Sequence, residues 1–228
     1  MRKENGERGD KNLAMMAVYI VLLLTGLVFL ESINQLPWSP YFIIYAVGAI
    51  VVPLILMPAI GIQFGRLKDF KIHRLNLYLI LLLAVALFVL NFEMNSLLKP
   101  ALNQLAEAAA QKFGWTTIQA LGIFAIYIIV WAPIAEELLY RGLLQGTLRK
   151  CYSFNIAVLV SSFFFGIRHA THLFFLWPNV LYEAIIIWAG FAFIAGLIYG
   201  YIYERTKSLY LAIIVHFAIN LLALLATF

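Results

Sequence analysis

Long apolar stretches, separated by short polar segments, follow one another along the whole chain. They lie at residues 13–30, 41–63, 77–92, 117–140, 158–177, 182–203 and 209–227. Each stretch is close to the roughly 20 residues that an α-helix needs to cross about 30 Å of hydrocarbon. The pattern predicts an all-α, polytopic membrane protein with about seven transmembrane helices.

The segment between the third and fourth stretches has a different pattern. Its apolar residues fall on one helical face, which leaves Lys99 and Lys112 for the aqueous side. These apolar residues are Leu98, Leu102, Leu105, Ala109 and Phe113. The pattern is typical of an amphipathic helix in the membrane interface, and we expect one over residues 98–114, on the outer surface.

The composition agrees with a membrane protein. Of the 228 residues, 64% are hydrophobic and 12% are charged, and the mean hydropathy is +0.93. A soluble domain of this size cannot bury so much apolar surface. Cys151 is the single cysteine, so no intrachain disulfide and no cysteine-based metal site are expected.

The two ends of the chain and its basic residues predict an orientation. Residues 1–12 form a polar tail, and no small-residue cleavage site follows the first apolar stretch, so an uncleaved first transmembrane helix fits better than a signal peptide. Most lysines and arginines lie in this tail and at 65–76, 149–150 and 205–207. Because positive charge is retained on the cytoplasmic side, we expect the N-terminus in the cytoplasm and the C-terminus outside.

Two adjacent glutamates and an arginine stand at the end of the fourth stretch. Glu136 and Glu137 follow the uncharged run 118–135, and a charge kept at such a place is expensive and usually functional. Glu137 and Arg141 are four residues apart, in the favourable orientation for a helical ion pair. Glu136 points about 100° away, so we expect it to be unpaired and available for chemistry. The alternative is that both glutamates are interfacial charges at a helix end.

Two histidines are predicted to reach the depth of Glu136. His169 follows it by 33 residues, and the turn of the helical hairpin between them lies near residues 152–153, so the two side chains share one height. His216 lies about 10 Å into the last stretch, and Asn220 follows one turn later on the same face. A carboxylate with two imidazoles suits either a Zn²⁺ site formed by Glu136, His169 and His216 or a general-base system that activates water.

Other residues receive less specific expectations. His172, one turn beyond His169, is expected to be a hydrogen-bonded core residue. Arg168 is expected to pair with a carboxylate or to extend towards water. The first three stretches lack polar clusters, so residues 13–97 are expected to be a scaffold.

Three motifs resemble those of a known family. They are Glu136-Glu137-x-x-x-Arg141, Phe165-x-x-x-His169 and His216-x-x-x-Asn220, in this order. They resemble the motifs of the CPBP family, which comprises CAAX prenyl proteases and bacteriocin-processing enzymes and is also called the Abi family. The resemblance covers about residues 115–225. It implies an intramembrane endopeptidase. We expect the chain to be a single membrane domain, 1–228, with its catalytic part at 115–228.

The resemblance also implies roles for the motif residues. Glu136 activates water with help from His169, while His216 and Asn220 complete a metal site or stabilise the tetrahedral oxyanion. The supporting residues are Glu137, Arg141 and Phe165. Zinc is one cofactor that this set allows, but we slightly prefer a metal-free mechanism, because Asn220 is a poor zinc ligand and a good oxyanion donor.

The expected partners are membrane lipids and a peptide or lipidated protein substrate, with no nucleic acid. We expect the protein in a bacterial cell membrane, with its cavity open to the cytoplasm. One alternative is a transporter or channel, since intramembrane carboxylates and histidines also line ion paths; ion flux abolished by changing Glu136 would favour it. The other is a catalytically idle scaffold, which full cellular function of a Glu136→Ala protein would support.

Overall fold

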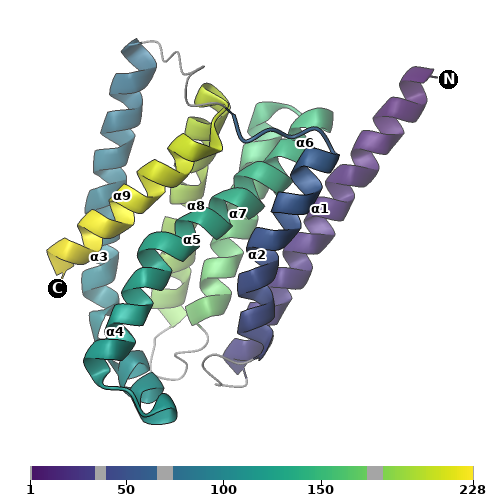
Figure 1. Ribbon diagram of the computed structural model, residues 1–228. Coiled ribbons are helices and arrows are strands. Elements are labelled where there is room, and N and C mark those ends of the chain that lie inside the picture. Colours follow the sequence, from purple (N-terminus) through teal and green to yellow (C-terminus); the bar gives the residue numbers. More distant parts are fainter. Residues whose placement is uncertain (1, 34–39, 66–73, 174–181, 228) are drawn as a thin grey trace.

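The computed structural model describes residues 2–33, 40–65, 74–173 and 182–227, and helices form nearly all of them (Figure 1). In chain order they are α1 (Arg2–Ile33), α2 (Pro40–Ala59), α3 (Arg74–Phe113), α4 (Thr117–Ile126), η2 (Tyr127–Trp131), α5 (Ala132–Glu136), η3 (Glu137–Gln145), α6 (Gly146–Cys151), α7 (Phe154–Leu173), α8 (Tyr182–Thr206) and α9 (Leu209–Thr227). Within the described residues, seven helical segments are long and apolar enough to cross a membrane. The predicted all-α, polytopic fold is confirmed.

Two helices are longer than the apolar pattern suggests. The expected polar tail is helical from Arg2 and forms the first part of α1. The segment expected as a separate amphipathic helix is helical, but it continues α3 without a break, with Pro100 inside the helix. The C-terminal part of α3 packs against α4, where Ala106 and Ala110 contact Ala120. The added length of α3 is therefore packed against the next helix.

The fourth apolar stretch belongs to one helical run from Thr117 to Cys151, in which the α-helix gives way twice to a π-helical segment. Two π-helical segments, η2 and η3, lie on either side of the short α5. Pro133 stands in the first turn of α5, and because it has no N–H it cannot take part in the regular ladder of hydrogen bonds. Short π-helical segments are frequent at functional sites, and here η2 precedes the two glutamates while η3 begins at Glu137.

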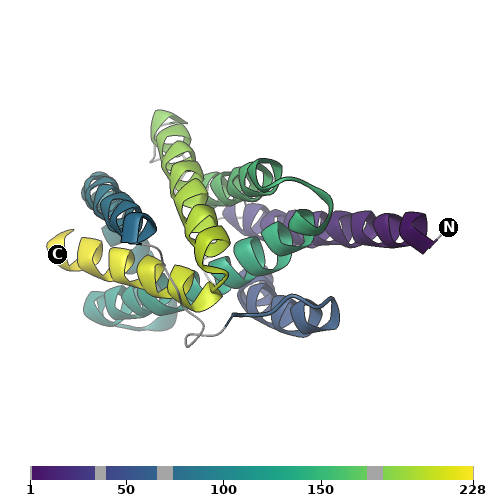
Figure 2. The same cartoon turned by 90° about the horizontal axis from the view of Figure 1, so that it is seen from above.

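The segment η3 lies in the middle of the molecule. Every residue from Glu137 to Gln145 is buried, and η3 contacts α1, α2, α7, α8 and α9. Figure 2, seen from above, shows α1, α2, α8 and α9 spread around this part of the chain. A polar group on η3 therefore has protein on all sides and must find its partners there.

Close contact of α8 with its neighbours depends on two glycines. A Cβ atom added to Gly196 would lie 2.9 Å from the Cβ of Ser162 on α7, and one added to Gly200 would lie 2.8 Å from Oε1 of Gln145 on η3. This confirms the close approach expected of small residues in membrane helices. A Cβ atom added to Gly190, on the same helix, would meet nothing within 4 Å, so this glycine is not required for close contact.

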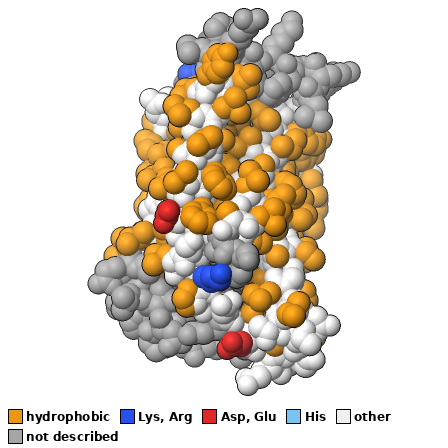
Figure 3. Space-filling model, turned by 90° about the vertical axis from the view of Figure 1, so that its left-hand side faces the viewer, with side chains coloured by type: hydrophobic (Ala, Val, Ile, Leu, Met, Phe, Trp, Pro, Cys, Tyr) orange, Lys and Arg blue, Asp and Glu red, His pale blue; other side chains and the backbone are white. Residues whose placement is uncertain are grey.

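The outer surface of the helices is apolar. On α3, Tyr78, Leu82 and Val85 are exposed, and Figure 3 shows that hydrophobic side chains dominate the middle of the face that the viewer sees. Such a surface is stable only against lipid or another protein. The chain is an integral membrane protein.

Candidate active site

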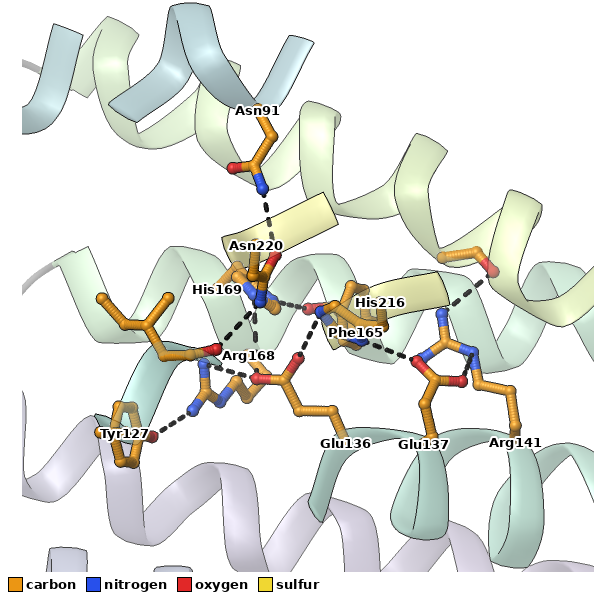
Figure 4. A network of polar contacts seen from close by, with 12 residues as sticks. Asn91, Tyr127, Glu136, Glu137, Arg141, Phe165, Arg168, His169, His216 and Asn220 are labelled. Carbon is orange, nitrogen blue, oxygen red and sulfur yellow. Dashed lines mark hydrogen bonds and ion pairs between the residues drawn. The ribbon is translucent and has the colours of Figure 1, made fainter. Parts of the chain in front are cut away.

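Each of the two adjacent glutamates has an arginine of its own (Figure 4). Oε2 of Glu137 lies 3.3 Å from Nε of Arg141, and both side chains are fully buried, which confirms the predicted ion pair. Oε1 of Glu136 lies 3.4 Å from Nη1 of Arg168 on α7. The expectation that Glu136 is unpaired is wrong, because its partner comes from another helix and cannot be inferred from spacing within one helix.

The histidine of α7 has one ring nitrogen fixed. Nδ1 of His169 lies 2.8 Å from the carbonyl oxygen of Phe165. A carbonyl oxygen can only accept, so in this contact the ring carries its proton at Nδ1. Nε2 of His169 then faces Oε1 of Glu136 at 4.0 Å.

The histidine of α9 bridges the two glutamates. Nδ1 of His216 lies 3.0 Å from Oε1 of Glu137, and Nε2 lies 3.8 Å from Oε2 of Glu136. The ring also stacks on Tyr199, with centroids 4.3 Å apart and planes inclined by 18°. The structure therefore brings Glu136, His169 and His216 together, as the depth argument predicted.

Phe165 supports this cluster with its ring as well as its backbone. The centroid of its ring lies 4.4 Å from that of the His169 ring. Cζ of Arg141 lies over the Phe165 ring, 4.5 Å from its centroid. Arg141 also donates from Nη2 to the carbonyl of Gly196 at 3.1 Å. The absence of a side chain at Gly196 lets α8 pack closely on α7, where an added Cβ atom would lie 2.9 Å from that of Ser162.

Asn220 is fixed through both ends of its carboxamide. Its Oδ1 accepts from Nδ2 of Asn91 at 3.0 Å, and its Nδ2 donates to the carbonyl of Ile128 at 3.0 Å. In a π-helix that carbonyl would accept from the residue five positions later. This residue is Pro133, which has no N–H, so Asn220 supplies the missing donor.

The expected scaffold contributes directly to the site. Asn91 lies on α3 and is 7% exposed, and its bond to Asn220 connects that helix to α9. Tyr45 lies on α2, and its hydroxyl accepts from Nε of Arg168 at 2.8 Å. Residues of the expected scaffold, 13–97, thus hold two side chains of the site through specific hydrogen bonds. An asparagine inside an apolar stretch was the signal that could have revealed this role.

The set expected as zinc ligands fits a metal ion poorly. Among the residues that the structure describes, no three His, Cys, Asp or Glu side chains gather closely enough to hold one. The guanidinium of Arg168 already balances the charge of Glu136, and a dication at the same carboxylate would add strong repulsion at short range.

The side chain of His172 and residues 174–181 lie outside the part that the structure describes. The expectation of a hydrogen-bonded core role for His172 stays a prediction.

The fold and the site define a polytopic membrane protein with a buried carboxylate that faces two imidazoles. Residues 118–222 match the family model described as Rce1-like, type II CAAX prenyl endopeptidase Rce1-like. This part of the chain is therefore similar to that family, in agreement with the resemblance to the CPBP family that the three motifs carry.

A relative from Bacillus subtilis (strain 168), named "Putative membrane peptidase YdiL", is 34% identical over 105 residues. The matched region is 45% of this chain and 36% of that protein, so the chain matches about a third of the relative's length. No solved structure matches. Residues 118–222, which match the family model, contain all the motif residues, whereas Tyr45 and Asn91 precede them.

Proposed function

We propose that the protein is an intramembrane endopeptidase that hydrolyses peptide bonds in membrane-associated or lipidated peptides and proteins. The observation that carries the proposal is the position of Glu136, whose two carboxylate oxygens face Nε2 of His169 at 4.0 Å and Nε2 of His216 at 3.8 Å. Glu136 is 2% exposed, so this arrangement is held inside the protein. The match to CAAX prenyl endopeptidases supports the reaction class.

The separations suit a water molecule between the carboxylate and the rings. When Nδ1 of each ring is protonated, Nε2 is an acceptor, and the carboxylate oxygens are acceptors as well. One water about 2.8 Å from each acceptor can donate a hydrogen bond to both. For acceptors 3.8 or 4.0 Å apart, the angle between them at the water oxygen is then about 90°. Glu136 is then within reach of the proton that it removes, through hydrogen bonds of ordinary length.

The reaction proceeds in two proton transfers. Glu136 takes a proton from water while the oxygen attacks the peptide carbonyl carbon, which forms a C–O bond and a tetrahedral oxyanion. The C–N bond then breaks, and the protonated Glu136 gives the proton to the leaving amine. The products are a new carboxyl terminus and a new amino terminus, and His169 and His216 orient the water throughout.

Asn220 is the proposed donor to the oxyanion. Its Nδ2 carries two hydrogens, of which the carbonyl of Ile128 accepts one, so the second is left for the substrate. Its Oδ1 already accepts from Asn91, which keeps the amino group turned away from α3. A donor held in advance in a site that excludes water stabilises developing charge strongly.

The basic end of the helices is the proposed side of entry. Helix α6 carries Arg149 and Lys150, and the turn between α8 and α9 carries Lys207. This helix and this turn lie at the same end of the molecule (Figure 1). By the positive-inside rule this end is cytoplasmic. Phe163 is exposed on α7, and we place the apolar or lipidated part of the substrate beside it. Phe165, two residues later, is buried and packs against His169 instead.

Comparison of host cells tests the proposal. Membrane-bound and secreted peptides are identified by mass spectrometry in cells that carry wild-type protein, Glu136→Gln protein or neither. We expect a set of precursors to accumulate equally in the last two strains and their fragments to appear only in the first. Identical peptides in all three strains would contradict an endopeptidase function.

A further inference from the structure

The charges of the buried cluster balance only when Arg168, which lies outside the motif Glu136-Glu137-x-x-x-Arg141, is counted. Glu136 and Glu137 carry two negative charges, and Arg141 supplies one positive charge. The second comes from Arg168, whose side chain is 4% exposed. Buried ions are tolerated when they are paired and fully hydrogen-bonded, so the cluster requires Arg168 for neutrality.

Arg168 is held on three sides. Its Nη1 faces Oε1 of Glu136 at 3.4 Å, its Nε donates to the hydroxyl of Tyr45 at 2.8 Å, and its Nη2 donates to the hydroxyl of Tyr127 at 3.0 Å. These contacts use all three nitrogens of the planar guanidinium. Lysine, with a single nitrogen on a flexible stem, could not make the same three contacts.

The two tyrosines are themselves fixed by aromatic packing. Tyr127 stacks on Trp131 within η2, with centroids 4.7 Å apart, and Tyr45 meets the same Trp131 edge-on at 5.8 Å. Tyr45 is fully buried. The π-helical winding of η2 and the packing of α2 therefore aim both hydroxyls at Arg168, which in turn faces Glu136.

We propose that Arg168 is the counter-ion and positioning residue of Glu136, fixed by a cradle of Tyr45, Tyr127 and Trp131. It acts through the carboxylate: with Oε1 held towards α7, Oε2 remains directed at His216. The proposal extends the site to α2, which precedes the region that matches the family. It rests on the proposed endopeptidase function only for its effect on turnover.

The ion pair itself is tested without a substrate. The midpoint of thermal unfolding is measured in detergent for wild-type protein, Arg168→Met, Glu136→Gln and the double variant, with Arg205→Met, an exposed arginine of α8, as the matched control. We expect each single variant to unfold at a lower temperature and the double variant to unfold above Arg168→Met, because no buried charge is then left alone. Shifts that simply add would overturn the pairing. If Arg168→Met does not fold, a folded double variant supports the proposal, and failure of both overturns it.

Turnover tests the positioning role. The probe is a precursor peptide that accumulates in cells with Glu136→Gln protein. We expect Tyr45→Phe and Tyr127→Phe to lower kcat by about tenfold at unchanged KM, and Arg168→Lys to retain more activity than Arg168→Met. Wild-type kcat in a folded Arg168→Met protein would overturn the positioning role. Should Glu136→Gln also keep full turnover, the proposed catalytic role of Glu136 fails, while the coupled unfolding shifts still report on the ion pair.

Discussion

Nδ1 of His216 lies 3.0 Å from Oε1 of Glu137, so the second glutamate of the adjacent pair holds the imidazole that faces the first. From the sequence, Glu137 was expected only as the ion partner of Arg141. The structure gives it both tasks, one at each carboxylate oxygen. The two neighbouring carboxylates therefore differ in their surroundings: Glu137 contacts Arg141 and Nδ1 of His216, whereas Glu136 faces Nε2 of both histidines.

Replacement of each glutamate by glutamine should separate these tasks. Glu137→Gln leaves Arg141 buried without its counter-ion, and we expect a loss of about 3 kcal/mol in the free energy of unfolding. The glutamine oxygen can still accept from Nδ1 of His216, so some turnover should remain. Glu136→Gln should lower turnover by at least about a hundredfold. Denaturant unfolding and peptide cleavage measure the two effects, and a fully active Glu136→Gln beside an inactive, well-folded Glu137→Gln would reverse the assignment.

Asn91 should matter for turnover although it lies far from the motifs in sequence. Asn91→Leu removes the donor to Oδ1 of Asn220, so the carboxamide can rotate away from its working orientation. We expect about a tenfold lower kcat and a loss of about 1 kcal/mol in stability. In an Asn220→Ala background the same change should have no further effect on kcat.

The control for this prediction is Asn95→Leu. Asn95 lies one helical turn after Asn91 on α3 and is half-buried. Equal losses of turnover from the two substitutions would show that Asn91 acts only through the packing of α3.

Metal removal should leave the activity intact. Arg168 already neutralises Glu136, and the described His, Cys, Asp and Glu side chains do not gather into a metal-binding group. We expect purified protein to carry far less than one equivalent of zinc and to keep its turnover after dialysis against a chelator. Activity that disappears with the chelator and returns with zinc would contradict the metal-free account.

The orientation in the membrane is best tested at exposed positions. Residues 137–145, at first sight suitable for cysteine labelling, are all buried. Ser153 and Thr116 are exposed. Ser153 lies in the turn between α6 and α7 and Thr116 in the turn before α4, and these two turns lie at opposite ends of the molecule (Figure 1). In a Cys151→Ser background, we expect Ser153→Cys to react with a membrane-impermeant thiol reagent only from the cytoplasmic side, and Thr116→Cys only from outside. The reverse pattern would contradict the proposed side of entry.

The fold could be predicted from the sequence almost completely, because lipid imposes a simple rule on the chain. Each apolar stretch must form a helix that pairs its own backbone N–H and C=O groups. The number of stretches long enough to cross the membrane then gives the number of spans. The rule does not locate the end of a helix that continues beyond the membrane. For this reason α3 was predicted to end near residue 92, although it continues to Phe113.

The site could be predicted where it depends on position along a helix. The common depth of Glu136, His169 and His216 follows from counting residues around hairpins, and the structure brings the three together. The contacts of Tyr45 and Asn91 depend instead on which helices lie side by side and how each is rotated. A single tyrosine or asparagine in an apolar stretch carries no spacing from which such a partner can be read.

The central claim is that Glu136 activates water to hydrolyse a peptide bond, and oxygen labelling tests it most directly. Purified wild-type and Glu136→Gln proteins in liposomes are incubated with an accumulating precursor peptide in water enriched in ¹⁸O, and the fragments are analysed by mass spectrometry. Our account predicts that the wild-type protein yields two fragments, with ¹⁸O at the new carboxyl terminus, and that Glu136→Gln yields neither. Equal amounts of the same labelled fragments from both proteins would contradict it.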